Sequence, residues 1–279
     1  MNFTDLVIQG PTAALQDIEA LHALAGASGL KQIDEHAWRL KAANKREGIA
    51  EYCASKKLDY AFVPAERRLA DFGLVAMDMD STLITIECID EIADMLGIKS
   101  EVAAITASAM RGEIEFKESL RRRVALLKGL DEGALQRVYD ERLRLSPGAE
   151  RMLARLRSLG IRTLLVSGGF TFFTERLKTR LALDYTAANV LAINGGKLLG
   201  SVVGEIVDAQ GKARALRETR ESLGLTKQQV IAIGDGANDL AMLAEADVAV
   251  AYHAKPIARA AATYCLDHSG LDGVVNLFR

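Results

Sequence analysis

The chain has 279 residues, of which 49% are hydrophobic and 26% are charged, and this composition excludes a disordered chain. Its 35 basic and 37 acidic residues leave a formal net charge of -2, so no overall basic field draws it to nucleic acid or to an anionic membrane. We therefore expect a small-molecule partner, no nucleic acid and no membrane.

The first part of the chain predicts a small α+β unit. The apolar run 6–8 indicates a strand, the apolar spacing over 15–24 indicates an amphipathic helix, and Trp38 and Leu40 indicate a second strand. We interpret these three elements as a βαβ-like unit. A second helix is expected around 49–53, and a short strand over 60–63 follows it.

The charged segment 64–71 reads as a linker, which predicts a domain boundary near residue 70. Beyond it, apolar strands alternate with helices, which is the pattern of a parallel sheet covered by helices. The predicted core strands cover residues 74–77, 163–166, 230–233 and 248–251. The fold class is therefore α/β, with a small domain of residues 1–70 followed by a large domain of residues 71–279.

Residues from about 87 to 146 read as helices without a strand, between the first two core strands. This stretch is too long for a simple crossover. Because it follows the first polar loop, we expect it to form a helical cap over the ligand crevice, where it would exclude water and recognise the substrate. A β-hairpin is predicted further on, with strands near 190–193 and 198–203 around the turn Asn194-Gly195-Gly196-Lys197.

The cysteines point to a reducing compartment. Cys53, Cys88 and Cys265 are scattered, without the paired spacing of a disulfide framework or a zinc site. The first ten residues lack the basic and apolar parts of a signal peptide, and no stretch approaches the ~20 apolar residues that span a bilayer. We predict a cytoplasmic protein.

Three core strands each run into a polar loop, at residues 78–82, 167–169 and 234–239. In an open α/β sheet the ligand crevice lies beyond the carboxyl ends of the strands, so these loops should converge. Asp78, Asp80 and Asp235 would then bring carboxylates together. Magnesium prefers a few carboxylates while keeping water and phosphate oxygens in its shell, so we predict a Mg²⁺ site.

These residues suit phosphoryl transfer. Asp78 could attack phosphorus, and a protonated Asp80 could give its proton to the departing alkoxide and later take one from water. Lys212 would neutralise charge on the phosphoryl group, while Ser167 and the backbone of Gly168 would donate to its oxygens. Each motif alone is commonly structural: a turn, or a helix cap in the case of Asn238 or Asp239. Their conjunction favours the catalytic interpretation.

In order along the chain, the motifs resemble the four motifs of the haloacid dehalogenase superfamily, and the longer strings resemble its phosphoserine phosphatase family. The strings are Asp78-Met79-Asp80-Ser81-Thr82, Val166-Ser167-Gly168-Gly169-Phe170, Lys212, Gly234-Asp235-Gly236-Ala237-Asn238-Asp239 and Ala251-Tyr252-His253-Ala254-Lys255-Pro256. The resemblance implies a Rossmann-like core with a helical cap. It also implies that Asp78 is the nucleophile, that Asp80 is the acid/base, and that Asp78, Asp80 (through its carbonyl) and Asp235 bind Mg²⁺.

The same resemblance implies the substrate, O-phospho-L-serine, and thereby the final step of serine biosynthesis. Glu87 and Arg123 match the cap positions that read it, with Arg123 gripping the carboxylate and Glu87 accepting from the ammonium. Asn238 would orient the phosphate side of the site. The alternative is that Arg123 has no role in binding and is simply one residue of the basic run 121–123 on a solvated helix face.

Two other functions remain open at this point. A phosphotransferase or mutase of the superfamily would share the phosphoryl-aspartate, although Glu87 with Arg123 suits an amino acid better than a sugar phosphate. A metabolite-sensing module with a silent large domain is opposed by the intact catalytic residues. The N-terminal region loosely resembles small regulatory (ACT-like) domains, and its suggested roles are regulation or assembly of a homodimer.

Overall fold

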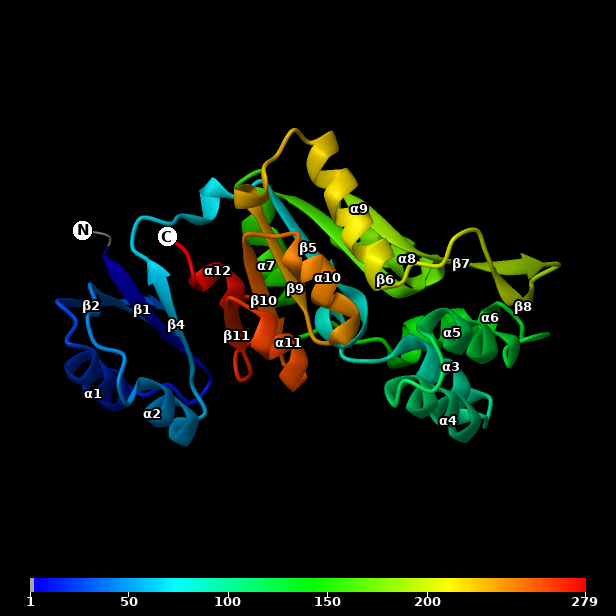
Figure 1. The fold of residues 1–279 in the computed structure, drawn as a ribbon, viewed down its shortest axis with the longest axis horizontal. Coiled ribbons are helices and arrows are strands. Elements are labelled where there is room, and N and C mark those ends of the chain that lie inside the picture. Colours follow the sequence, from blue (N-terminus) through cyan, green and yellow to red (C-terminus); the bar gives the residue numbers. More distant parts are fainter. Residues whose placement is uncertain (1–2) are drawn as a thin grey trace.

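The computed structural model describes residues 3–279, which form two β-sheets with helices packed against each (Figure 1). The N-terminal sheet has the strand order β2-β3-β1-β4, and all of its pairings are antiparallel. This is the ferredoxin-like β-α-β-β-α-β arrangement. The elements are β1 (Thr4–Gln9), α1 (Leu15–Ala25), β2 (Gly29–Asp34), β3 (Ala37–Lys41), α2 (Ile49–Lys56) and β4 (Asp59–Pro64).

The predicted α+β character of this region is confirmed, but its interpretation as a βαβ-like unit is wrong. β2 was not predicted, because it lies at the sheet edge and its residues Gly29–Asp34 are mostly polar and exposed or half-buried. A strand of this kind leaves no apolar alternation to detect. Because β2 turns back into β3, the strand that pairs with β1 runs antiparallel to it.

The large sheet has the order β11-β10-β9-β5-β6-β7-β8 and is parallel except for β8. All four predicted core strands are confirmed, as is the hairpin, whose turn residues Gly195 and Gly196 both have positive φ. The short edge strand β11 was not predicted. The strands are β5 (Leu74–Asp78), β6 (Arg162–Phe170), β7 (Tyr185–Asn194), β8 (Lys197–Val203), β9 (Val230–Gly234), β10 (Val248–Tyr252) and β11 (Tyr264–Leu266).

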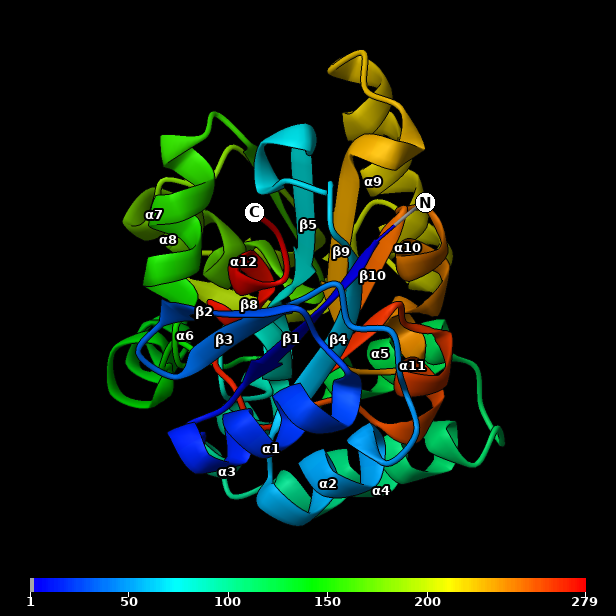
Figure 2. The same cartoon turned by 90° about the vertical axis from the view of Figure 1, so that its left-hand side faces the viewer.

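Helices cover both faces of this sheet (Figure 2). Successive side chains of a strand point to opposite faces, so Val75 and Met77 of β5 join the core beneath α7 and α8, while Leu74 and Ala76 join the core beneath α9 and α10. This double burial explains why the central strands are continuous apolar runs. The helices are α7 (Ala149–Ser158), α8 (Thr171–Leu181), α9 (Ala209–Ser222), α10 (Leu240–Ala244), α11 (Pro256–Ala261) and α12 (Gly273–Asn276).

The insertion after β5 is helical, as predicted, and lies at the opposite end of the long axis from the N-terminal sheet (Figure 1). The β7–β8 hairpin holds it through backbone hydrogen bonds: Gly129 donates to Leu198, and Glu132 donates to Gly196. The cap helices are α3 (Cys88–Met95), α4 (Lys99–Met110), α5 (Phe116–Ala125) and α6 (Gly133–Arg137), followed by a π-helical turn over Val138–Arg142. None of the helices within residues 3–279 is long and apolar enough to cross a membrane.

The face of the N-terminal sheet that α1 and α2 leave uncovered packs on the large unit. Val7, Ala61 and Val63 belong to the same apolar cluster as Phe278. The buried carboxylate of Asp59 adds a polar anchor, because it accepts hydrogen bonds from the backbone N–H groups of three consecutive residues, Asp267, His268 and Ser269, at 2.7–3.2 Å. The chain segment after β11 is thereby fixed to β4.

Asp59→Asn should weaken this attachment. The substitution keeps the shape but turns one acceptor oxygen into an NH₂ group that faces backbone donors, so at least one hydrogen bond to a charged group is lost. We expect the free energy of unfolding to fall by roughly 2–4 kcal/mol. Urea denaturation measures this, with Asp140→Asn at an exposed site as the control. Equal stability of the two variants would show that the Asp59 contacts contribute nothing.

Candidate active site

Three polar segments meet where β5, β6 and β9 end: the turn after β5, the last residues of β6 and the loop after β9. The chain passes from β5 to β6 on one side and later reaches β9 on the other, so this is the switch point at which open α/β sheets bind ligands. The loop after β5 is a tight turn over Met79–Leu83, in which Ser81 adopts a left-handed φ of 57°. The predicted convergence of the polar segments is therefore present in the structure, although residues 167–169, predicted as a loop, lie within β6 where its pairing with β7 is irregular.

A buried lysine lies between two buried carboxylates at the centre of the site. The ammonium of Lys212 donates to Oδ1 of Asp78 at 2.6 Å and to Oδ1 of Asp239 at 2.8 Å. Burial lowers the pKa of Lys212, but the two carboxylates outweigh it and the pKa is raised overall. Burial raises the pKa of Asp78, and the negative charge of Asp239 raises it further, against the opposing effect of Lys212.

Asp239 also organises the loop after β9, a role that the sequence analysis missed when it treated this residue as a helix cap. Its Oδ2 accepts from the backbone N–H groups of Asp235 and Gly236, both at 3.0 Å, and it makes no side-chain capping bond to α10. Gly234 permits this packing, because a Cβ there would lie 2.6 Å from the Asp239 side chain. Asp239 is the last residue of the motif Gly234-Asp235-Gly236-Ala237-Asn238-Asp239, so its place in that motif could have indicated this role.

The carboxylates of Asp78, Asp235 and Asp239 can bring one oxygen each within 4.8 Å of one another. Burial raises the pKa of Asp235 to about 6, with the charge of Asp239 as the next cause. An all-oxygen set of crowded, buried carboxylates fits a hard divalent cation such as Mg²⁺. The side chain of Asp80 is not part of this group, and the sequence analysis expected only its backbone carbonyl as a ligand.

The carboxyl group of Asp80 instead faces the carboxyl-terminal end of β6. Its Oδ1 accepts from the backbone N–H of Cys88 at 3.1 Å, and the hydroxyl of Ser167 lies 3.5 Å from its Oδ2. Ser167 also accepts from the backbone N–H of Gly169 at 2.8 Å. Burial raises the pKa of Asp80 to about 7, and the charge of Glu87 adds to this. A carboxyl group with this pKa can both give and take a proton near neutral pH.

Two cap residues face the same region. Glu87 accepts from the hydroxyl of Ser81 at 2.8 Å, which ties the start of the cap to the loop after β5. Arg123 is half-buried, whereas Arg121 and Arg122 are exposed. Burial lowers the pKa of Arg123, and nearby carboxylates oppose this effect, those of Glu87 and Asp80 among them. The structure thus separates Arg123 from its two neighbours, which sequence spacing could not do.

The carboxyl-terminal end of β6 has a further support that was not predicted. The buried side chain of Asn189 on β7 donates to the carbonyl of Gly168 and accepts from the backbone N–H of Val207, both at 2.8 Å. The cap reaches over this end of the strand, because a Cβ on Gly168 would lie 3.2 Å from the ring of Phe116. Asn238 is exposed, and its side chain makes no hydrogen bond to the described residues.

Lys212→Met tests whether the ammonium of Lys212 stabilises the two buried carboxylates. It removes the ammonium and leaves Asp78 and Asp239 buried side by side, so we expect the free energy of unfolding to fall by about 3–5 kcal/mol. Urea denaturation without divalent cations measures this, with the exposed Lys227→Met as the control. Adding Asp239→Asn to Lys212→Met should restore part of the loss. A loss no greater than that of the control would refute the assignment.

The chain is similar in sequence to several known proteins. The haloacid dehalogenase-like hydrolase model matches residues 75–244, and a domain of unknown function (DUF4072) matches residues 6–49. The phosphoserine phosphatase of a Polaromonas strain is 53% identical over 217 residues, which cover 76% of this chain and 92% of that protein.

Two solved structures cover nearly the whole chain. A haloacid dehalogenase family hydrolase from Salmonella enterica serovar Typhi has a TM-score of 0.90 at 29% identity, covering 100% of this chain and 99% of that one. An unliganded probable phosphoserine phosphatase from Vibrio cholerae has a TM-score of 0.85 at 38% identity, covering 99% of this chain and 86% of that one. The likeness therefore extends to the N-terminal unit.

Proposed function

The chain belongs to the phosphoserine phosphatases of the haloacid dehalogenase-like hydrolases, and we propose that it hydrolyses O-phospho-L-serine to L-serine and phosphate through a phosphoryl-aspartate on Asp78. This reaction is a phosphoric monoester hydrolysis that yields serine, the final step of serine biosynthesis. The observation that carries the proposal is the buried Asp78–Lys212 pair beside Asp235 and Asp239, at the carboxyl ends of the central strands.

In the first step a carboxylate oxygen of Asp78 attacks phosphorus, and the bond between phosphorus and the serine oxygen breaks. Asp80 gives its proton to that departing oxygen, for which its raised pKa suits it. In the second step a water molecule attacks phosphorus, Asp80 takes its proton, and the acyl phosphate bond to Asp78 breaks. The enzyme is thereby restored and phosphate leaves.

The remaining residues of the site bind the phosphoryl group and neutralise its charge. Lys212 lies next to Asp78 and offers positive charge to the phosphoryl oxygens, and Ser167 with the backbone N–H of Gly168 adds donors. Asn238 is proposed to orient the phosphate side of the site. Mg²⁺ would be held by the carboxylates of Asp78 and Asp235 and by the Asp80 carbonyl, with Asp239 beside them, and when bound it supplies charge neutralisation at the phosphoryl group.

Glu87 and Arg123 are proposed to select the substrate. Phosphoserine carries a carboxylate and an ammonium group besides its phosphate, and these need one cation and one anion held apart from the metal site. The half-buried guanidinium of Arg123 can grip the carboxylate with two parallel hydrogen bonds, and Glu87 can accept from the ammonium. A sugar phosphate has neither an ammonium group nor a carboxylate for this pair to bind, which argues against a mutase.

The remaining features of the proposal concern organisation. We place a domain boundary near residue 70, with a helical cap over about 87–146. The two family models support the boundary, because one matches residues 6–49 and the other residues 75–244. A cytoplasmic location is supported by the three free thiols. Regulation or dimerisation through residues 1–70 stays a prediction.

Asp78→Asn tests the nucleophile. The amide keeps the shape of the side chain but lacks the attacking charge, so turnover of phosphoserine should collapse, by roughly a thousandfold or more. Steady-state phosphate release measures this, and circular dichroism checks that the fold persists. In the unaltered enzyme, a metal-fluoride mimic of the phosphoryl group should bind against Asp78. Turnover at an appreciable fraction of that of the unaltered enzyme would refute the mechanism.

Arg123→Ala tests the substrate assignment. A hydrogen bond to a charged group contributes about 1.5–3 kcal/mol, so the substitution should reduce kcat/KM for phosphoserine by roughly 10- to 150-fold. An aryl phosphate, which has no carboxylate, should lose much less. Arg123→Lys should recover only part of the activity, because lysine supplies the charge without the planar fork.

Arg122→Ala is the matched control, since Arg122 pairs with Glu118 on the exposed face of the same helix. Equal losses on both substrates in Arg123→Ala would mean that Arg123 organises the cap rather than reading the carboxylate. Unchanged kinetics on both substrates would remove Arg123 from the site.

A further inference from the structure

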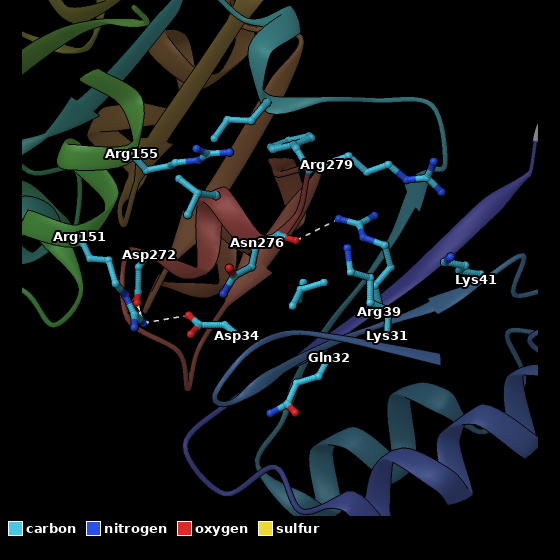
Figure 3. Close-up of a pocket in the computed structure, with 14 residues that line it drawn as sticks. Lys31, Gln32, Asp34, Arg39, Lys41, Arg151, Arg155, Asp272, Asn276 and Arg279 are labelled. Carbon is cyan, nitrogen blue, oxygen red and sulfur yellow. Dashed lines mark hydrogen bonds and ion pairs between the residues drawn. The ribbon is translucent and has the colours of Figure 1, made fainter. Parts of the chain in front are cut away.

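A cavity of about 680 Å³ lies between the N-terminal sheet and the large unit (Figure 3). Strands β2 and β3 form one wall, while α7, α12 and the C-terminal segment form the other. This volume lies in the range of small-molecule sites. None of the residues assigned to catalysis or substrate recognition lines it, and the cap lies at the opposite end of the molecule (Figure 1).

The cavity wall carries six cationic side chains and two anionic ones. The N-terminal strands supply Lys31, Arg39 and Lys41, and the large unit supplies Arg151, Arg155 and Arg279. Cations from two different parts of the fold thus surround one space. Because like charges repel, this arrangement has a cost unless anions offset it.

Only some of these cations have a counter-ion. Arg151 pairs with both Asp34 and Asp272. Arg39 and Arg279 share the buried carboxylate of Asp5, at 3.5 and 3.0 Å.

Lys31, Lys41 and Arg155 form no ion pair with any residue in the part of the chain that the structure describes. These three face the cavity from both of its walls. The excess positive charge is therefore concentrated around the space itself.

Arg39 shows that the wall is built rather than incidental. Its side chain is only 3% exposed, and its Nη2 donates to the carbonyls of Asn276 and Leu277, both at 3.1 Å. Its buried Nη1 makes no hydrogen bond to a described residue, although Asp5 lies 3.5 Å away. A buried guanidinium with an unmet donor needs a further acceptor nearby.

We propose that this cavity binds a small organic polyanion, a molecule with at least two phosphate or carboxylate groups. Two acidic groups are required because the unpaired cations lie on both walls, with Lys31 and Lys41 on the sheet and Arg155 on α7. An organic body is favoured because apolar side chains, among them Ile33 and Val275, also line the space. The bound molecule joins the N-terminal sheet to the large unit.

A ligand that binds only the folded chain raises the free energy of unfolding by RT ln(1 + L/Kd), where L is the free ligand concentration, so the thermal stability rises with ligand concentration. Because the attraction is between charges, the affinity falls as the NaCl concentration rises. These two dependences give the experiment its readouts, and neither of them requires the catalytic reaction.

The test uses the full chain without divalent cations, so that the probes are not chelated. Pyrophosphate and ADP represent phosphate chemistry and citrate represents carboxylate chemistry, with uncharged adenosine as the negative probe. Isothermal titration calorimetry gives affinity and stoichiometry, and thermal denaturation gives stabilisation. We expect at least one polyanion to bind with one molecule per chain, adenosine to bind none, and the probe that binds to identify its source chemistry.

Substitutions then locate the binding. Arg155→Ala and Lys31→Ala together should lower the affinity for the polyanion by about 10-fold or more, since each removes a charge-assisted contact. Arg180→Ala and Lys45→Ala together are the matched control, because both residues are exposed and lie outside the cavity. Phosphoserine turnover should stay unchanged in both double variants, which shows that each is folded.

Each outcome decides the proposal. Loss of binding only in the cavity variant supports it. Binding that persists in the cavity variant places the anion elsewhere, for example in the catalytic site, and overturns the proposal. Absence of binding by all three polyanions overturns it as well, and the cavity is then a water-filled gap between the two units.

Discussion

The rest of the catalytic site depends on one interaction, the contact of the buried ammonium of Lys212 with Asp78 and Asp239. Burial raises the pKa of Asp78, and the neighbouring charge of Lys212 opposes this rise because it favours the ionised carboxylate. Lys212 is brought there by α9, whose first turn is capped by Asp208. The packing of α9 on the sheet therefore influences the pKa of Asp78 on β5.

A second constraint acts at the other end of the molecule. The N-terminal sheet shares its apolar face with the main core and ties down the segment after β11 through Asp59. The attachment leaves a cationic cavity beside it rather than a sealed interface. A ligand that fills this cavity would add to the free energy of docking. β10 and β11 belong to the same sheet as the strands that carry the site residues. Docking of the N-terminal sheet therefore acts on the sheet that also holds the site in place.

The sequence predicts what depends on local patterns. Continuous apolar strands that end in Asp, Ser and Gly residues identify the sheet and the converging loops, because burial on both faces and the close approach of backbone to ligand each require those residue types. What it does not predict depends on tertiary contacts. Asp239 meets Lys212 only after α9 has packed, Asn189 supports Gly168 from a different strand, and β2 is a polar edge strand without alternation.

The charge of the site itself argues for a cation in catalysis. Asp78, Asp235 and Asp239 bring three carboxylates together against the single ammonium of Lys212. A phosphomonoester carries up to two negative charges near neutral pH, so its approach to this cluster would be repelled at the low dielectric of a closed site. A divalent cation held by these carboxylates would offset that repulsion. Asp239, whose charge raises the pKa of Asp78, belongs to the group that would hold this cation, so binding of the cation would favour the ionised form of Asp78 as well as the approach of the substrate.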